Sequence, residues 1–199
     1  MSWEPIAPRL EGEIVVVEPL GPEHEEGLWQ AASDPRIWRW MPVNAIESPE
    51  TFAAWFTEAQ ERTAAGLDQA FVVVDADSGN PLGSTRYLAL RPEHRGLEIG
   101  WTWLSSAAWG TGANVEAKLL LMGHAFDELG CMRVEFKTDA LNERSGAALE
   151  ALPAQFEGIF RKHMLVRDGA SRDSAWYSVT DEEWPAVRQN LLDRLTDLR

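Results

Sequence analysis

Apolar residues recur along the chain with two kinds of spacing, and the spacing predicts the secondary structure of each segment. Runs that are β-branched or alternate apolar with polar positions predict strands at residues 13–20, 70–75, 81–90 and 97–105. The most strongly patterned helix covers about residues 112–129. Its apolar residues lie four, three, four and three positions apart, which predicts one buried stripe made of Val115, Leu119, Met122, Phe126 and Leu129.

The same reading places further helices at residues 23–33, 48–65, 142–152 and 181–198, and further strands at residues 132–138, 156–166 and 174–179. Ser48 precedes a proline and is a typical N-cap, and Asn142 can cap the helix that follows it. Gly66 and Gly130 are typical helix ends. Strands joined first by hairpins and then across helices predict a mixed, mostly antiparallel α/β sheet of about seven strands, with helices on both faces. A chain of 199 residues is expected to form one domain spanning residues 1–199.

The strand at residues 97–105 runs into a turn that contains Gly110 and Gly112 and then into the patterned helix. We expect Ile99, Trp101 and Trp103 on one face of this strand and Glu98, Gly100 and Thr102 on the other. The first N–H groups of a helix have no partner inside the helix and point along the positive end of its dipole. Glycines let a phosphate approach such a backbone closely. The turn therefore predicts an anion site, with a plain structural turn as the alternative.

The net charge of the chain limits the classes of molecule that it is expected to bind. Its 18 Lys and Arg residues against 32 Asp and Glu residues give a net charge of −14. We therefore expect no nucleic acid and no anionic membrane as partners, because both need a broad positive surface, whereas cationic amines would be attracted. No apolar stretch approaches membrane-spanning length, and the first residues do not match a signal peptide. A single cysteine, Cys131, excludes an internal disulfide, so a reducing, cytoplasmic location is expected.

Metal and nucleotide chemistry have weak support in the sequence. The four histidines lack metal-ligand spacing, and no metal is expected. His124 is expected on the solvated side of its helix, and Cys131 in the core. The turn that contains Gly110 and Gly112 lacks the Lys-Ser/Thr ending of a nucleotide-triphosphate loop, and it also lacks the three-glycine dinucleotide fingerprint. A nucleotide-dependent enzyme remains a third alternative, without the lysine and the metal-binding aspartate that phosphoryl transfer requires.

One motif order is more specific than any single residue. A strand, the turn WGTGAN, an amphipathic helix, a strand and the segment TDALNERSGAALEAL follow one another. This order resembles the GNAT superfamily of acyl-CoA-dependent N-acetyltransferases, in particular its ribosomal-protein N-terminal acetyltransferase subgroup (RimJ/RimL-type), over roughly residues 13–185. The resemblance implies acetyl-CoA as cosubstrate, bound by Trp109, Gly110, Thr111, Gly112, Ala113, Asn114 and Asn142.

The resemblance also implies roles in the reaction, in which a neutral amine attacks the thioester without a covalent enzyme intermediate. A free α-amino group has a pKa of about 8 and a lysine of about 10.4, so the site needs a base. Glu98 is the implied general base, with a solvated strand carboxylate as the alternative and Glu157 as a weaker second candidate. Many relatives use a tyrosine as the acid for the CoA thiolate, but Leu149 stands at that position here. The resemblance instead implies that Ser145 donates a hydrogen bond to the thiolate, with an ordinary helix residue as the alternative.

The acceptor and some departures from the family pattern leave alternatives open. Trp38, Trp40 and Met41 are implied as acceptor-binding residues, with core packing as the alternative. The acceptor is an amine-bearing small molecule or a protein N-terminus. Tryptophan-rich surface candidates leave a homodimer open.

Two residues depart from the family pattern. Asn114 stands where relatives have a small residue. Pro153 stands where they have a glycine at positive φ, an angle that proline is not expected to adopt. A non-catalytic CoA-binding or assembly module that retains the fold is therefore the alternative function.

Overall fold

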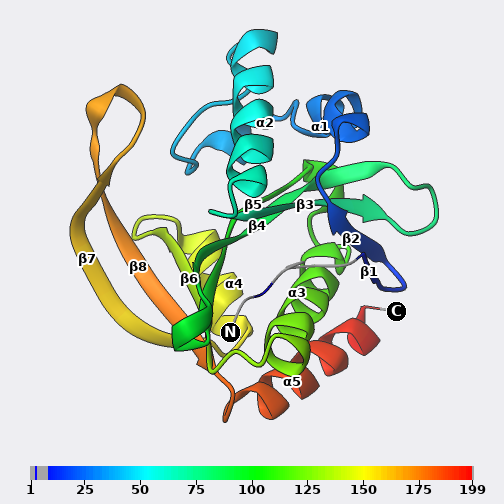
Figure 1. Cartoon of the computed structure of the whole chain (residues 1–199), viewed down its shortest axis with the longest axis vertical. Coiled ribbons are helices and arrows are strands. Elements are labelled where there is room, and N and C mark those ends of the chain that lie inside the picture. The colour runs from blue at the N-terminus through cyan, green and yellow to red at the C-terminus, as the bar shows by residue number, and fades with distance from the viewer. Residues whose placement is uncertain (1–2, 4–8, 199) are drawn as a thin grey trace.

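One eight-stranded sheet runs through the part of the chain that the computed structural model describes, residue 3 and residues 9–198 (Figure 1). Its strand order is β1-β2-β3-β4-β5-β6-β8-β7, and every neighbouring pair is antiparallel except β5 with β6. The strands are β1 (Leu10–Glu11), β2 (Val15–Pro19), β3 (Gln69–Asp75), β4 (Pro81–Arg91), β5 (Gly96–Leu104), β6 (Arg133–Asp139), β7 (Gln155–Leu165) and β8 (Ser171–Thr180).

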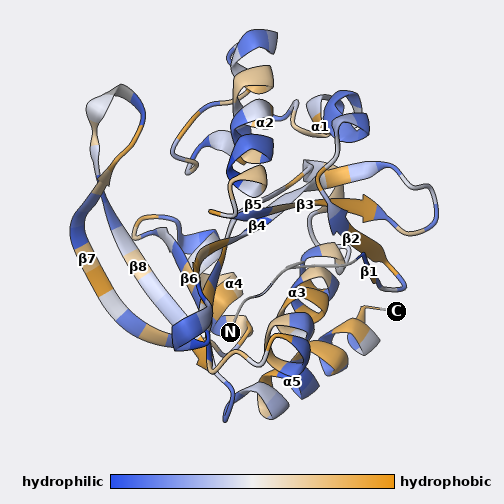
Figure 2. Ribbon diagram, viewed as in Figure 1, coloured by the Kyte–Doolittle hydropathy of each residue, from blue (hydrophilic) through white to orange (hydrophobic). Residues whose placement is uncertain are grey.

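Helices cover both faces of the sheet, each over its own apolar core (Figures 1 and 2). Side chains of α1 and α2 pack with Trp38 and Trp103 on one face, and side chains of α3, α4 and α5 pack with Tyr87 and Leu97 on the other. The α-helices are α1 (Glu25–Ala31), α2 (Pro49–Ala64), α3 (Ala113–Gly123), α4 (Glu143–Ala151) and α5 (Trp184–Asp197).

The predicted fold class is confirmed: the sheet is mixed and mostly antiparallel, with helices on both faces. The two-residue strand β1 at the sheet edge brings the number of strands in the described residues to eight rather than about seven. Ser48 caps α2 as predicted, because its side chain accepts a hydrogen bond from the N–H of Thr51. No helix among the described residues is both long and apolar enough to cross a membrane.

The predicted end of the central helix at Gly130 is confirmed, but its last turn is not an α-helix. After Gly123 its last turn, His124–Glu128, is a π-helix, and Gly130 closes it at a φ of +66°. His124 is 4% exposed, stacks on Tyr87 and has Nδ1 3.2 Å from the Tyr87 hydroxyl oxygen. The prediction of a solvated His124 is therefore wrong, because the buried face of the helix contains Ala117 and Leu121, and His124 lies on that face seven and three residues later.

The buried stripe predicted for this helix is only partly correct. Met122 and Phe126 are buried, but Val115, Leu119 and Leu129 are half-buried at the margin of the core. The helix also buries three alanines and one leucine, which the predicted stripe does not include: Ala113, Ala117, Leu121 and Ala125. The helix axis consequently lies close to the strands beneath it.

Glu116 anchors the start of β2 to α3. Its carboxylate accepts hydrogen bonds from the N–H groups of Glu13, Ile14 and Val15, at 3.0, 2.6 and 2.7 Å. The side chain is buried, so these charge-assisted bonds satisfy a carboxylate that would otherwise be costly to remove from water. They fix the first turn of α3, and hence the loop before it, to the sheet.

Strand β5 contains a bulge that reverses its faces. Trp101 has a φ of +50°, and the β4–β5 register jumps so that Trp101 and Thr102 together face Thr85. As a result Ile99 packs in the core under α3, whereas Trp103 packs in the core under α2. The prediction that these two side chains share a face is wrong, because a one-residue insertion exchanges the two faces of a strand.

Candidate active site

The only parallel pairing in the described sheet opens into a cleft. Strands β5 and β6 pair at Gly96 with Arg133, Leu97 with Val134, and Glu98 with Glu135, and no further. Beyond Glu98, β5 continues to Leu104 and β6 to Asp139 without pairing to each other. A cavity of about 590 Å³ lies there, lined by both strands, the loop before α3, and α4.

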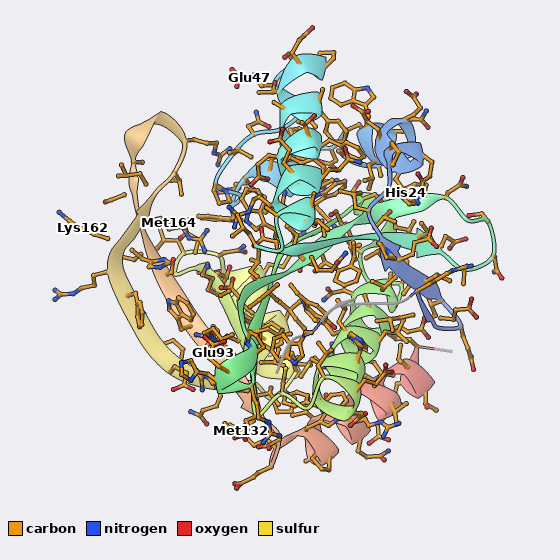
Figure 3. All side chains as sticks on the ribbon, viewed as in Figure 1. His24, Glu47, Glu93, Met132, Lys162 and Met164 are labelled. Carbon is orange, nitrogen blue, oxygen red and sulfur yellow. The ribbon has the colours of Figure 1, made fainter. Side chains whose placement is uncertain are left out.

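Residues far apart in the sequence meet in this cavity. It extends from Gly110 and Gly112 to the β7–β8 hairpin, which contributes Met164 and Arg172. Figure 3 shows Met164 on this hairpin, whereas Lys162 points away from the molecule. Long side chains from the segment before α2 complete the wall: Ile37, Trp40, Met41 and Pro42.

Glu98 lies at the point where β5 and β6 separate. It is 1% exposed, and its Oε2 accepts a hydrogen bond of 2.8 Å from Lys137 Nζ. Its Oε1 has no hydrogen-bond partner among the described residues. Burial raises the pKa of Glu98 above its usual value, and the nearby Lys137 ammonium acts in the opposite direction. The alternative of a solvated strand carboxylate is therefore wrong.

Gly100 keeps the space beside this carboxylate open. A Cβ at position 100 would lie 2.8 Å from Glu98 Oε1 and 2.8 Å from Leu88 Cδ1. Both distances are shorter than van der Waals contact, so a larger residue would displace the Glu98 carboxylate or the Leu88 side chain. The glycine thus allows Glu98 to face the cavity directly.

The loop before α3 has the geometry of an anion cradle. Gly110 and Gly112 have φ angles of +78° and +91°, a region that other residues rarely adopt. The N–H groups of Gly110, Gly112, Asn114 and Val115 have no acceptor within the described part of the protein. They lie at the N-terminus of α3, where the helix dipole favours negative charge.

Trp109 holds this loop in place. Its indole Nε1 donates a hydrogen bond of 2.9 Å to the carbonyl oxygen of Leu104. The Arg144 guanidinium lies 4.0 Å from the centre of the ring, and that of Arg36 lies 5.1 Å from it. These cation–π contacts bring positive charge next to the free N–H groups of the loop.

The cavity is basic although the chain carries a net charge of −14. In the described residues, Glu98 is the one carboxylate of the lining, against five cations: Lys118, Lys137, Arg144, Arg172 and Arg194. Lys118 is half-buried, with its Nζ 3.4 Å from Thr102 Oγ1 and 5.2 Å from the centre of the Phe136 ring, and burial lowers its pKa to about 8. An anionic ligand therefore fits this cavity, and the net acidity of the chain does not describe its local potential.

Several predicted site residues lie together in the cavity lining. Trp109, Gly110, Gly112, Asn114, Asn142, Ser145, Glu98, Trp40 and Met41 all do. The side chain of Asn142 also caps α4, since its Oδ1 accepts a hydrogen bond of 3.2 Å from the N–H of Ser145. The predicted capping role of Asn142 is thus confirmed.

Three predicted binding residues do not line the cavity. Trp38 is 1% exposed, donates from Nε1 to the carbonyl oxygen of Ala32 and packs against Trp103, so the packing alternative is correct for it. Thr111 donates from its hydroxyl to the carbonyl oxygen of Ala108, and Ala113 is fully buried. Thr111 and Ala113 thus support the conformation of the loop before α3 without lining the cavity.

The remaining sequence candidates are structural. Glu157 accepts hydrogen bonds from Ser178 and Arg133 outside the cavity. Cys131 is buried, and burial raises its pKa to about 12, as expected for a core thiol.

Pro153 has a φ of +24°, so the expectation that it avoids a positive φ is wrong. No cluster of three or more potential metal ligands occurs in the part of the chain that the structure describes.

Sequence reasoning missed the cations of the site. Lys118 carries a weak signal, because it lies three residues after Val115 and interrupts an apolar helix face. Lys137 and Arg172 carry none, because their positions depend on which strands pair and in what register. Arg144 and Arg194 lie on polar helix faces that look solvated in the sequence.

The splayed sheet, the cradle of N–H groups and the buried carboxylate meet at one cavity. The chain belongs to the GNAT acetyltransferase domain family. The family model described as "Acetyltransferase (GNAT) domain" matches residues 15–155. The family uses acetyl-CoA as its acetyl donor.

Known proteins similar to this chain agree with that assignment. The chain is 25% identical, over 86% of its length and 96% of the relative, to the uncharacterized N-acetyltransferase YoaA of Bacillus subtilis (strain 168). A GCN5-related N-acetyltransferase from Brucella melitensis is 32% identical and has a TM-score of 0.88, over 94% of this chain and 85% of that one. Mycobacterium smegmatis RimJ, solved with CoA-disulfide, shares the fold at 20% identity with a TM-score of 0.78, over 94% of this chain and 93% of that one.

Proposed function

We propose that this chain, as a single domain, transfers an acetyl group from acetyl-CoA to a primary amine of a small molecule or a protein N-terminus. The observation that carries the proposal is the buried carboxylate of Glu98, whose Oε1 has no partner in the described protein and which shares a cavity with the cradle of free N–H groups. The fold shared with Mycobacterium smegmatis RimJ supports a RimJ/RimL-type subgroup within the family.

The residues of the cradle fit the diphosphate of acetyl-CoA. The free N–H groups of Gly110 and Gly112 would donate to phosphate oxygens, and Arg144 and Arg194 line the same end of the cavity. Asn142 would contact the pantetheine arm with the donor group that the cap of α4 leaves unused. The arm would then lie between β5 and β6, where the strands no longer pair.

Glu98 supplies the proton acceptor in this proposal. The amine nitrogen loses a proton to Glu98, directly or through water, and forms a C–N bond to the acetyl carbon while the C–S bond breaks. A backbone N–H near Gly100 or Trp101 would bind the carbonyl oxygen in this proposal, which the absence of a β6 neighbour beyond Glu98 supports. Ser145, in the lining, donates a hydrogen bond to the departing thiolate, which then takes a proton from water and leaves as the CoA thiol, while Glu98 returns its proton to the solvent.

A screen of amines for CoA release in the presence of acetyl-CoA tests this function. We expect turnover with at least one class of primary amine, and a loss of about 100-fold or more in kcat/KM in a Glu98→Gln variant. Direct binding of acetyl-CoA without turnover by any amine would instead support the non-catalytic CoA-binding module. That second candidate is favoured by Leu149, which places no hydroxyl where relatives have a tyrosine.

A further inference from the structure

Arg172 on β8 is a buried guanidinium without a hydrogen bond. Its side chain is 6% exposed and lines the cavity. Its Nε has no hydrogen-bond partner among the described residues, and Asp139 Oδ2, its nearest carboxylate oxygen, lies 3.8 Å away. That distance fits an ion pair but is too long for a hydrogen bond.

An arrangement of this kind is costly unless a ligand completes it. A buried charge is normally both paired and hydrogen-bonded, because removing it from water is expensive. Arg86, which is also buried, has at least one such bond: its Nη1 lies 2.9 Å from Glu58 Oε2. Its guanidinium also lies over the rings of Trp55 and Trp101, while its Nε and Nη2 have no partner among the described residues. Arg86 does not line the cavity, whereas Arg172 does.

The other charged groups around Arg172 are already engaged. Lys137 donates its hydrogen bond to Glu98, and Asp139 accepts one from the N–H of Leu141. The ring of His163 bonds to Ser174 through Nδ1, and burial together with the neighbouring cations lowers the pKa of His163, which favours its neutral form. Arg172 therefore makes no hydrogen bond among the described residues, whereas each of these charged neighbours makes at least one.

Glu98 and Arg172 line the same cavity, and their opposite charges interact. Each shifts the pKa of the other: Arg172 acts to lower that of Glu98, and Glu98 acts to raise that of Arg172. A molecule with an amine at Glu98 could thus place an anionic group at Arg172. Trp40, Met41 and Met164 contribute apolar surface to the same cavity.

We propose that Arg172 binds the carboxylate of the acetyl acceptor, and that the acceptor is an α-amino acid or a closely related amino carboxylate with an apolar side chain. This inference rests on the proposed transferase function and narrows its acceptor. The planar guanidinium can donate two parallel hydrogen bonds to one carboxylate, which orients the amine toward Glu98. Simple amines and polyamines lack this anchor.

A matched set of acceptors tests the proposal. Leucine, methionine and phenylalanine are each compared with their amides and with their decarboxylated amines, by CoA release at saturating acetyl-CoA. Rates are corrected for the fraction of neutral amine. The intact protein should prefer the carboxylate form, and Arg172→Gln should lower kcat/KM for that form by about tenfold or more while changing it for the amides by less than about threefold.

Controls separate this residue from a general effect of charge or folding. Arg172→Lys should recover only part of the preference, because lysine keeps the charge but not the paired donors. Arg161→Gln removes an exposed arginine from the same hairpin and should leave the preference unchanged. Thermal unfolding and acetyl-CoA titration of each variant show that the fold and the donor site are intact.

Two outcomes would overturn the inference: equal use of acids and amides by the intact protein, or an equal loss for both in Arg172→Gln. The proposed function fails differently, with no CoA release from any amine. In that case the binding of N-acetylmethionine and of its amide, measured by calorimetry with CoA present, still decides the role of Arg172. Binding of the acid at least about tenfold tighter supports the role, and equal or absent binding contradicts it.

Discussion

Lys137 Nζ donates a 2.8 Å hydrogen bond to Glu98 Oε2 across the point where two parallel strands separate. The register pairs Glu98 with Glu135, so Lys137, two residues further along β6, points to the same face. Burial raises the pKa of Glu98, and this ammonium limits the increase. The pair thus sets the pH range over which Glu98 can accept a proton.

Removing the ammonium should move the pH dependence of activity. Glu98 accepts a proton only when it is ionised, so the acid limb of kcat/KM follows its pKa. In Lys137→Met that pKa rises further, and the acid limb shifts to higher pH by about one unit. Glu98→Gln should abolish the limb. Lys162→Met, on the outward side of the hairpin (Figure 3), is the control and should leave the acid limb in place. An acid limb that does not move in Lys137→Met would refute the assignment of Glu98 as the proton acceptor.

The cradle can be tested separately from the stability of the fold. Gly112 has a φ of +91°, and an added Cβ would lie 2.9 Å from Ile14 Cδ1. Gly112→Ala should therefore lower the free energy of unfolding by about 1–2 kcal/mol and weaken acetyl-CoA binding at least tenfold. Gly79→Ala, at a φ of +71° with open space around it, should show a similar backbone cost without loss of binding. Equal affinity in both variants would argue against the cradle.

Lys118 should make stability depend on pH. Its pKa is lowered to about 8 in the folded protein, below the ordinary value of 10.5, so the unfolded chain holds this proton more tightly. The charged form destabilises the fold at neutral pH, and stability recovers as pH rises from 8 to 10.5. Lys118→Met should therefore raise the free energy of unfolding at pH 7 by about 1–3 kcal/mol.

This gain should shrink as the pH approaches 10, because the lysine is then increasingly neutral in the folded protein. Urea unfolding of both proteins across that range measures it. A gain that does not change with pH would show that packing, rather than charge, is responsible. Lys162→Met, an exposed substitution, should give no gain at any pH.

Glu116 should be essential to the stability of the fold. Glu116→Ala leaves three N–H groups of residues 13–15 without their acceptor, and we expect a loss of about 3 kcal/mol or more. Glu61→Ala, on the exposed side of α2, should cost less than about 0.5 kcal/mol. Comparable unfolding midpoints for the two variants would contradict the anchoring role of Glu116.

Local patterns in the sequence were enough to predict what depends on neighbouring residues. The capping of α2 by Ser48 and of α4 by Asn142, and the glycine loop before α3, each follow from a few adjacent residues. The bulge at Trp101 could not be predicted, because alternation alone gives no reason for a tryptophan to adopt a positive φ. It becomes visible only when the register with β4 is known.

For the site as well, the sequence predicts features that depend on neighbouring residues but not those that depend on which strands pair. Glu98 was found through its motif, but its burial and its bond to Lys137 depend on the parallel register of β5 and β6. Arg172 comes from the far end of the chain and has no local signature. Trp38 was misplaced, because an aromatic segment does not reveal which of its rings face the core and which face a cavity.

The binding of acetyl-CoA at the loop tests the whole account most directly, by calorimetric titration of the intact protein and of Gly112→Ala. We expect one molecule bound per chain, with an affinity that falls at least tenfold in the variant and that decreases with added salt, since Arg144 and Arg194 line the same cavity. No heat at high micromolar acetyl-CoA, or equal binding by both proteins, would contradict it.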